Sequence, residues 1–151
     1  MGDSGSPTSR KGRIAVEDDL LDRERFVGLL IDHVRAPAIE GTVATMKAPP
    51  GRAPRPQRIE LSNWFNGLAE SDRAFVTRAM TDAVDGALFG VLCILDGAQS
   101  LNPRPGVLQR LVLRAELDDG RERLLSTHDE LEELHDIYNW LTREQAGSED
   151  S

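Results

Sequence analysis

The most continuous hydrophobic pattern in the chain covers residues 71–97. Apolar side chains recur there every three or four positions, the spacing that aligns them along one stripe of an α-helix. Ser71 is a suitable N-cap, and Gly97 can end the helix in a left-handed conformation. After Asp85 the polar positions become rare, so the second half should be covered on nearly all sides. The stripe consists of Val76, Met80, Ala83, Val84, Ala87, Leu88, Val91 and Leu95. The pattern predicts a central helix at about 71–96.

A second helical pattern precedes it, beginning at Asp18 or Asp19 and ending near Lys47. Pro37 lies inside this pattern. Proline has no amide proton to bond the carbonyl of His33, and its ring crowds the preceding turn. We therefore expect either a kinked helix or two short ones.

Residues 48–58 contain four prolines and three arginines. Prolines at this density favour an extended, non-helical loop. The loop is longer than a plain turn requires, and long loops in compact domains are often functional. Its arginines could hold an anionic ligand; they are Arg52, Arg55 and Arg58.

A short helix is predicted within 59–68, with Ser62 as its cap. Trp64 and Phe65 are its main apolar residues. Adjacent aromatic residues in a chain with so few are typical of core anchors, and the alternative is an exposed aromatic binding patch.

The hydrophobic period changes to two beyond residue 107, which predicts an antiparallel β-hairpin at about 108–125. Asp119 and Gly120 favour a two-residue type I′ turn. Two strands alone are marginal in water, so the hairpin should pack its apolar face on the helices. That face includes Leu111, Leu113, Ala115 and Leu117. The turn implies that Glu116 pairs with Arg123 and Ala115 with Leu124.

A final helix is predicted at about 128–141, because Thr127 and Glu130 form a capping box. Its apolar stripe consists of Leu131, Leu134, Tyr138 and Leu141. Together these patterns predict a mainly helical α+β fold. We expect one domain at 17–141, a disordered leader at 1–16 and an acidic disordered tail at 142–151.

Charge changes the functional interpretation, because the net charge of −8 is concentrated in the last part of the chain. Twelve acidic residues and three arginines follow residue 115. This distribution argues against nucleic-acid binding, which requires clustered Lys and Arg, and it suits a basic protein partner. The expected partner-binding residues on the last helix are Glu130, Glu132, Glu133 and Asp136.

Cysteine use and hydropathy indicate a cytoplasmic location. The single cysteine, Cys93, lies in the most apolar segment, where burial makes a thiol inert. The first residues lack the apolar stretch of a secretory signal. The strongly apolar segment at 87–95 is shorter than the roughly 20 residues that span a bilayer, so we expect no membrane association.

The candidate chemistry is weak. Glu132 and His135 share one helical face, but a di-iron site needs two such pairs and two further carboxylates, so we expect no metal and no cofactor. Asp82 and Asp85 lie opposite the apolar stripe, which favours a solvated face with Arg78 pairing Asp82. No serine lies in a nucleophile elbow. The sequence favours a non-enzymatic protein.

Four segments resemble a group of small bacterial cytoplasmic proteins that have no assigned activity. They are PPGRAPRP at 49–56, LSNWFNGL at 61–68, DGALFGVLCILDG at 85–97 and LHDIYN at 134–139. The resemblance runs from about Asp19 to Trp140 and implies no catalytic or binding residue. Small acidic proteins of this type often neutralise bacterial toxins, which by analogy suggests an immunity-like role.

Two functions follow from the sequence. The first is a non-enzymatic cytoplasmic interaction protein that binds a basic partner, such as a toxin, through the acidic face of the last helix. The alternative is a small-ligand-binding or enzymatic domain whose arginine-rich loop holds an anion. A homodimer with paired helices is a third possibility.

Overall fold

Five α-helices and one β-hairpin make up the computed structural model, which describes residues 21–100, 111–126 and 133–149. The elements in chain order are α1 (Arg23–Leu30), the π-helical segment η2 (Ile31–Arg35), α2 (Ala36–Lys47), α3 (Pro56–Gly67), α4 (Glu70–Asp96), β1 (Arg114–Glu116), β2 (Glu122–Leu124) and α5 (Leu134–Glu149). The mainly helical α+β class, the long central helix and the antiparallel hairpin are thus confirmed. No helix among the described residues is long and apolar enough to cross a bilayer.

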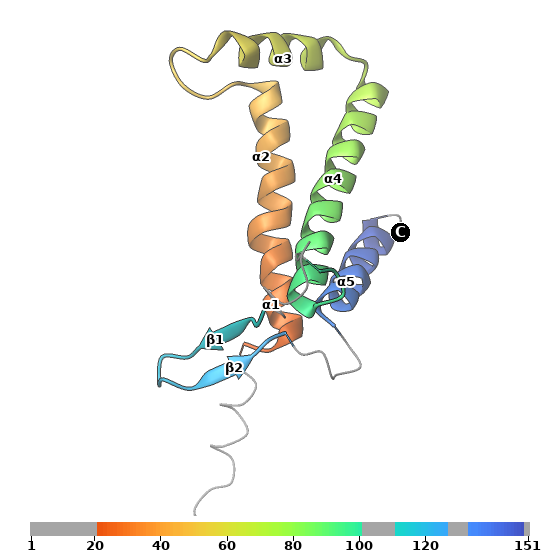
Figure 1. Ribbon diagram of the computed structural model, residues 1–151. Coiled ribbons are helices and arrows are strands. Elements are labelled where there is room, and N and C mark those ends of the chain that lie inside the picture. Colours follow the sequence, from red (N-terminus) through yellow and green to blue (C-terminus); the bar gives the residue numbers. More distant parts are fainter. Residues whose placement is uncertain (1–20, 101–110, 127–132, 150–151) are drawn as a thin grey trace, which may run out of the picture.

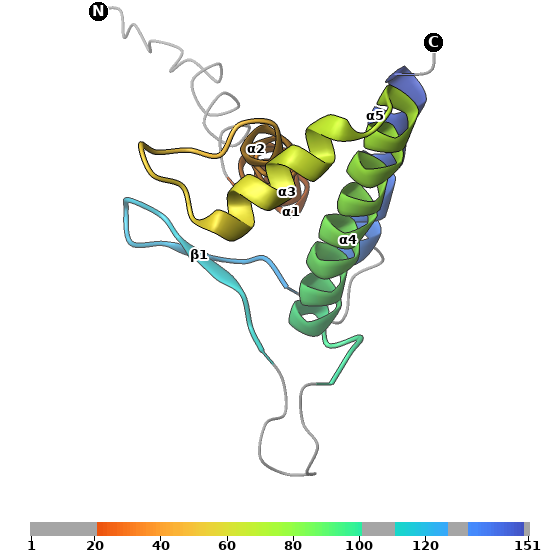
Figure 2. The ribbon, with the colours of Figure 1, turned by 90° about the horizontal axis from the view of Figure 1, so that it is seen from above.

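The helices form a tall frame above a small base (Figure 1). Helices α2 and α4 run antiparallel and diverge toward α3, which lies across their far ends. Helix α5 packs beside the lower half of α4, and α1 and the hairpin lie at the same lower end. Viewed from above, α1 lies behind α2, and α4 overlaps α5 on the other side of the frame (Figure 2).

The core lies at the base of this frame. Its buried cluster joins α1, η2, the end of α4 and the start of α5, and it consists of Val27, Ile31, Leu92, Leu134, Ile137 and Tyr138. Leu113, which precedes β1, packs against this cluster, as expected for the apolar face of the hairpin. At the upper end only Met46, Ser62 and Phe65 are buried among the described residues.

Pro37 does not divide the first helix. Helical structure continues through η2 into α2 and ends at Lys47, as predicted. The amide of Ala36 bonds the carbonyl of Ile31, five residues back instead of four. A π-helical turn of this kind is one way to accommodate an interrupted hydrogen-bond ladder, and such turns are frequent at functional sites.

The helix caps agree only in part with the prediction. Asp22 caps α1 by accepting the amide proton of Arg25 at 2.7 Å. Ser71 does not cap α4, because that helix begins one residue earlier and its N-cap is Ala69, whose side chain cannot bond. Gly97 ends α4 at a φ of 78°, so the left-handed stop is confirmed.

Burial along α4 corrects the prediction that its second half is covered on nearly all sides. Its buried residues are Leu92, Cys93 and Asp96, none of which belongs to the predicted stripe. Val91, from the stripe, is 53% exposed. Among the described elements, α5, α2 and η2 make the main contacts with α4.

Helix α3 begins earlier than predicted. It starts at Pro56, because proline is well tolerated in the first turn of a helix, so Arg58 is helical and lies outside the loop. Ser62 is not its cap. The Ser62 hydroxyl and the Asn66 amide both donate to the carbonyl of Lys47, at 3.2 and 2.9 Å, and so fasten α3 to the end of α2.

The aromatic pair of α3 divides between core and surface. Phe65 is 1% exposed, as a core anchor should be. Trp64 is 52% exposed, so its prediction as an anchor is wrong. Neighbouring positions on a helix point in different directions, so one ring can be buried while the next is exposed.

The hairpin register is shifted by one residue from the prediction. Ala115 pairs with Arg123, and Arg114 pairs with Leu124. The turn explains the shift, because the amide of Gly120 bonds the carbonyl of Leu117 at 2.8 Å and closes a three-residue loop. Gly120 adopts a φ of 79°, which a type I turn followed by a bulge requires. The strands are also shorter than the predicted 108–125.

Helix α5 runs to Glu149 instead of ending at residue 141, so the part of the expected disordered tail at 142–149 is helical. Within its predicted stripe, Leu134 and Tyr138 are buried and Leu141 is half-buried. Several predictions lie outside the described residues: the leader at 1–16, the caps Asp18 and Asp19, the capping box of Thr127 and Glu130, and the side chains of Leu131 and Glu132.

Candidate functional site

One carboxylate links three helices near the base of the frame. Asp85, on α4, accepts two hydrogen bonds from the guanidinium of Arg35 in η2, at 2.6 and 3.1 Å. The phenol of Tyr138, on α5, donates to the same carboxylate at 2.8 Å. The prediction that Asp85 lies on a solvated face is therefore wrong, whereas Asp82 is exposed.

The protonation of this network follows from its contacts. Burial raises the pKa of Asp85, but the hydrogen bonds from Arg35 and Tyr138 outweigh it and hold the pKa below its ordinary value. The bond to Asp85 raises the pKa of Arg35. Burial, followed by the bond to Asp85, raises the pKa of Tyr138 well above 10. The network therefore joins the helices as an ion pair with a neutral phenol.

A second cluster lies where the end of α4 meets the start of α5. Asp96 is 1% exposed, and its Oδ2 accepts the amide proton of His135 at 3.0 Å and lies 2.9 Å from the ring Nδ1. A carboxylate at this position caps the amino end of α5 and suits its dipole. Glu133 Oε2 lies 3.4 Å from the same Nδ1. The three residues bring two carboxylates and one imidazole together.

The surroundings of this cluster are partly apolar. The ring of Phe89 meets His135 edge-on, with the centroids 5.4 Å apart. Cys93 is buried, as predicted, and burial followed by the charges of Asp96 and Glu133 raises the pKa of its thiol. The thiol is therefore held in its unreactive, protonated form at neutral pH.

A surface pocket lies between α1 and α5. Its volume is about 360 Å³, and its described lining consists of Glu24, Asp136, Ile137 and Trp140. Trp140 is 49% exposed, so its ring is available at the pocket wall. Two carboxylates and an indole ring form a suitable environment for a cation.

The predicted acidic face is only partly covered by the structure. Glu130 and Glu132 lie outside the described residues. Glu133 turns toward His135 and is 28% exposed, whereas Asp136 is 60% exposed and borders the pocket. The sequence analysis did not identify Glu24 as a binding residue, because Glu24 belongs to a different helix and only folding brings α1 beside α5.

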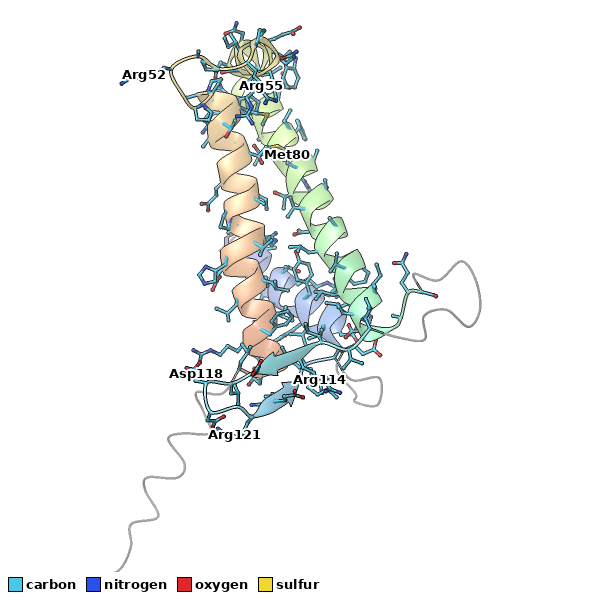
Figure 3. The ribbon with its side chains drawn as sticks, turned by 60° about the vertical axis from the view of Figure 1, so that its left-hand side comes forward. Arg52, Arg55, Met80, Arg114, Asp118 and Arg121 are labelled. Carbon is cyan, nitrogen blue, oxygen red and sulfur yellow. The ribbon has the colours of Figure 1, made fainter. Side chains whose placement is uncertain are left out.

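The arginines of the alternative hypothesis lie at the opposite end. Arg52 and Arg55 flank the turn between α2 and α3, and Arg58 is in the first turn of α3; all three are exposed. Arg52 points away from the body of the protein (Figure 3). None of the three lines the pocket described above.

Comparisons with known proteins identify no relative of this chain. No protein family matches the chain, and neither a curated protein nor a solved structure shows significant similarity to it. The resemblance drawn from the four sequence segments stays a prediction.

Proposed function

We propose that this chain is a non-enzymatic interaction protein that binds a basic protein partner through the surface shared by α1 and α5. The observation that supports this proposal is the pocket lined by Glu24, Asp136, Ile137 and Trp140. Its two carboxylates come from different helices, so the folded chain concentrates negative charge around an apolar floor.

The pocket matches the chemistry of a lysine or arginine side chain. The aliphatic stem of such a residue would pack on Ile137 and the Trp140 ring, and its charged group would lie between the carboxylates of Glu24 and Asp136. A cation over an indole face is stabilised by about 0.5–2 kcal/mol. The surrounding acidic residues of α5 would speed the approach of a basic partner.

The narrower form of this proposal is an immunity-like role in the cytoplasm, with a basic toxin as the partner. It relies on the sequence resemblance and on the concentration of acidic residues in the last part of the chain. A protein that neutralises a toxin by occupying its surface needs no catalytic group of its own, which agrees with the inert thiol of Cys93.

The test is capture of partners from the native cell, followed by binding kinetics with the purified partner. Asp136→Lys and Trp140→Ala should each reduce the affinity by about tenfold or more, because interface residues that anchor a complex contribute at least 1–2 kcal/mol. For Asp136→Lys the loss should lie mainly in the association rate and should diminish at high salt.

Glu60→Lys is the matched control for the charge reversal. Glu60 is an exposed acidic residue of α3, at the other end of the frame. If Glu60→Lys slows association as much as Asp136→Lys does, only net charge matters and the pocket is not the binding site.

The arginine-rich loop remains the alternative, with Arg52, Arg55 and Arg58 holding an anionic ligand. Thermal-shift screening with phosphates and nucleotides distinguishes the two hypotheses, because a ligand of the native state raises the melting temperature. A rise that disappears in Arg55→Ala would favour the alternative. The molar mass from light scattering would test the third possibility, a homodimer.

A further inference from the structure

We propose that Asp96, Glu133 and His135 form a binding site for a divalent transition-metal ion. They provide two carboxylate groups and one imidazole from the adjoining ends of α4 and α5. One potential ligand atom from each residue lies within 4.8 Å of the other two. None of the three ligands lines the pocket proposed for the protein partner, although Asp136 borders both sites. The metal proposal does not depend on that pocket.

The spacing of the donors suits an ion. Asp96 Oδ2 lies 2.9 Å from His135 Nδ1, and Glu133 Oε2 lies 3.4 Å from the same nitrogen. Zinc binds nitrogen and oxygen at about 2.0–2.2 Å, so neighbouring ligands of a tetrahedral ion lie roughly 3.3–3.6 Å apart. The distance from Glu133 fits this range, whereas the shorter distance from Asp96 is that of a hydrogen bond, which a bound ion would replace. Small side-chain rotations would therefore place all three donors around one centre.

The second observation is the other oxygen of Asp96. Oδ1 is fully buried and has no hydrogen-bond partner among the described residues. The hydrogen bond from the His135 amide explains why Oδ2 is buried, because it caps α5. It does not explain Oδ1, and a buried oxygen without a partner destabilises a fold by about 1–3 kcal/mol. A bound cation would compensate this charge.

Binding requires the ring of His135 to be neutral, with Nδ1 facing the ion and the proton on Nε2. Asp136 Oδ1 lies 3.8 Å from Nε2, on the other side of the ring. A carboxylate behind a ligating imidazole orients the ring and makes it a better ligand. Glu133, with 28% of its side chain exposed, gives the ion a route from solvent.

The donor set selects the class of ion. Calcium and magnesium prefer sites made of oxygen alone, and copper(I) prefers sulfur. One imidazole and two carboxylates suit Zn²⁺, with Mn²⁺ and Co²⁺ as related probes. Three protein ligands leave a position for water, as in zinc sites that are open to solvent.

The experiment is isothermal titration of the full chain with Zn²⁺, supported by the absorption spectrum of the Co²⁺ form. We expect one ion per chain and a Co²⁺ spectrum typical of mixed nitrogen and oxygen ligands. Glu133→Gln and His135→Gln should each weaken binding by at least about tenfold, in line with the effect of even indirect metal partners. Glu144→Gln, the same change farther along α5, should bind as the wild type does.

Asp96→Asn separates metal binding from the capping role. The new side chain retains an oxygen to accept the His135 amide proton but lacks the buried negative charge. We expect this variant to lose most of its Zn²⁺ affinity while the ion-free protein keeps its melting temperature. No binding of Zn²⁺, Mn²⁺ or Co²⁺ to the wild type would overturn the proposal, as would unchanged affinity in Glu133→Gln and His135→Gln. Normal Zn²⁺ binding by Trp140→Ala is expected even if that variant binds no partner.

Discussion

Asp85 shows how one residue can decide the arrangement of three helices. Its carboxylate holds Arg35 of η2 and Tyr138 of α5, so it fixes α4 between them. The pattern along α4 could not reveal this, because Asp85 lies opposite the apolar stripe, where a solvated residue would also lie. Its partners are 50 and 53 residues away in the chain, and local spacing does not encode such pairs.

Replacing Asp85 with asparagine should lower the free energy of unfolding by about 2 kcal/mol at neutral pH, since it removes the charged acceptor of two donors that remain partly buried. The pKa of Asp85 is lowered in the folded state, so its contribution is present above the ordinary value of 3.8 and is lost as the pH falls below it. The difference between wild type and variant should therefore shrink below about pH 4. Urea unfolding across this range measures it.

Asp82→Asn is the control for this comparison, because Asp82 lies one turn away on the same helix and is exposed. Its effect should stay within about 0.5 kcal/mol at every pH. Equal effects of the two variants would show that Asp85 stabilises the protein no more than a surface carboxylate does.

The cluster of Asp96, Glu133 and His135 was equally hidden from the sequence. The pair noticed there, Glu132 and His135, relied on helical spacing. The structure places His135 beside Glu133, which precedes α5, and beside Asp96 from another helix, while Glu132 lies outside the described residues. One signal in the sequence indicated that the Asp96 carboxylate is buried. Asp96 directly follows an apolar run and precedes Gly97.

At the scale of elements, the sequence correctly predicted those features that depend on residues close together in the chain. The left-handed stop at Gly97, the helix end at Lys47 and the alternation before the hairpin turn were all confirmed. The predicted register of the hairpin was wrong, because Asp119 and Gly120 are compatible with two types of turn whose loops differ in length by one residue. In a sheet, that single residue reverses the faces of the second strand, which is why Leu124 is 46% exposed.

The two adjacent aromatic residues of α3 allow a test of how this helix is attached. Phe65→Ala should destabilise the protein by about 3–4 kcal/mol, because it leaves a cavity at a position that is 1% exposed. Trp64→Ala should have an effect of about 1 kcal/mol or less, because that ring is 52% exposed. Thermal or urea unfolding measures both. A larger effect of Trp64→Ala than of Phe65→Ala would contradict the conclusion that Phe65 is the residue that attaches α3.

The whole molecule is uneven in its packing. The buried cluster lies at the base, where α1, η2, α4 and α5 meet, and all three buried residues of α4 are near its carboxyl end. The far end relies on Met46, Ser62 and Phe65. The loss of polar positions after Asp85 predicted that the second half of α4 is the more covered part, but not that Val91 stays exposed there, because the extent of coverage depends on where the other helices end.

This unevenness predicts two levels of protection from amide hydrogen exchange. Amides of α1, α5 and the last turns of α4 should exchange at least about tenfold more slowly than those of α3 and the first turns of α4, because local opening exposes fewer buried side chains at the upper end. Exchange followed by mass spectrometry at two protein concentrations measures the difference. Phe75, 69% exposed on the first part of α4, should lie in a rapidly exchanging segment at both concentrations. Uniform protection that appears only at the higher concentration would contradict the two-level description and show that a second copy covers the upper end.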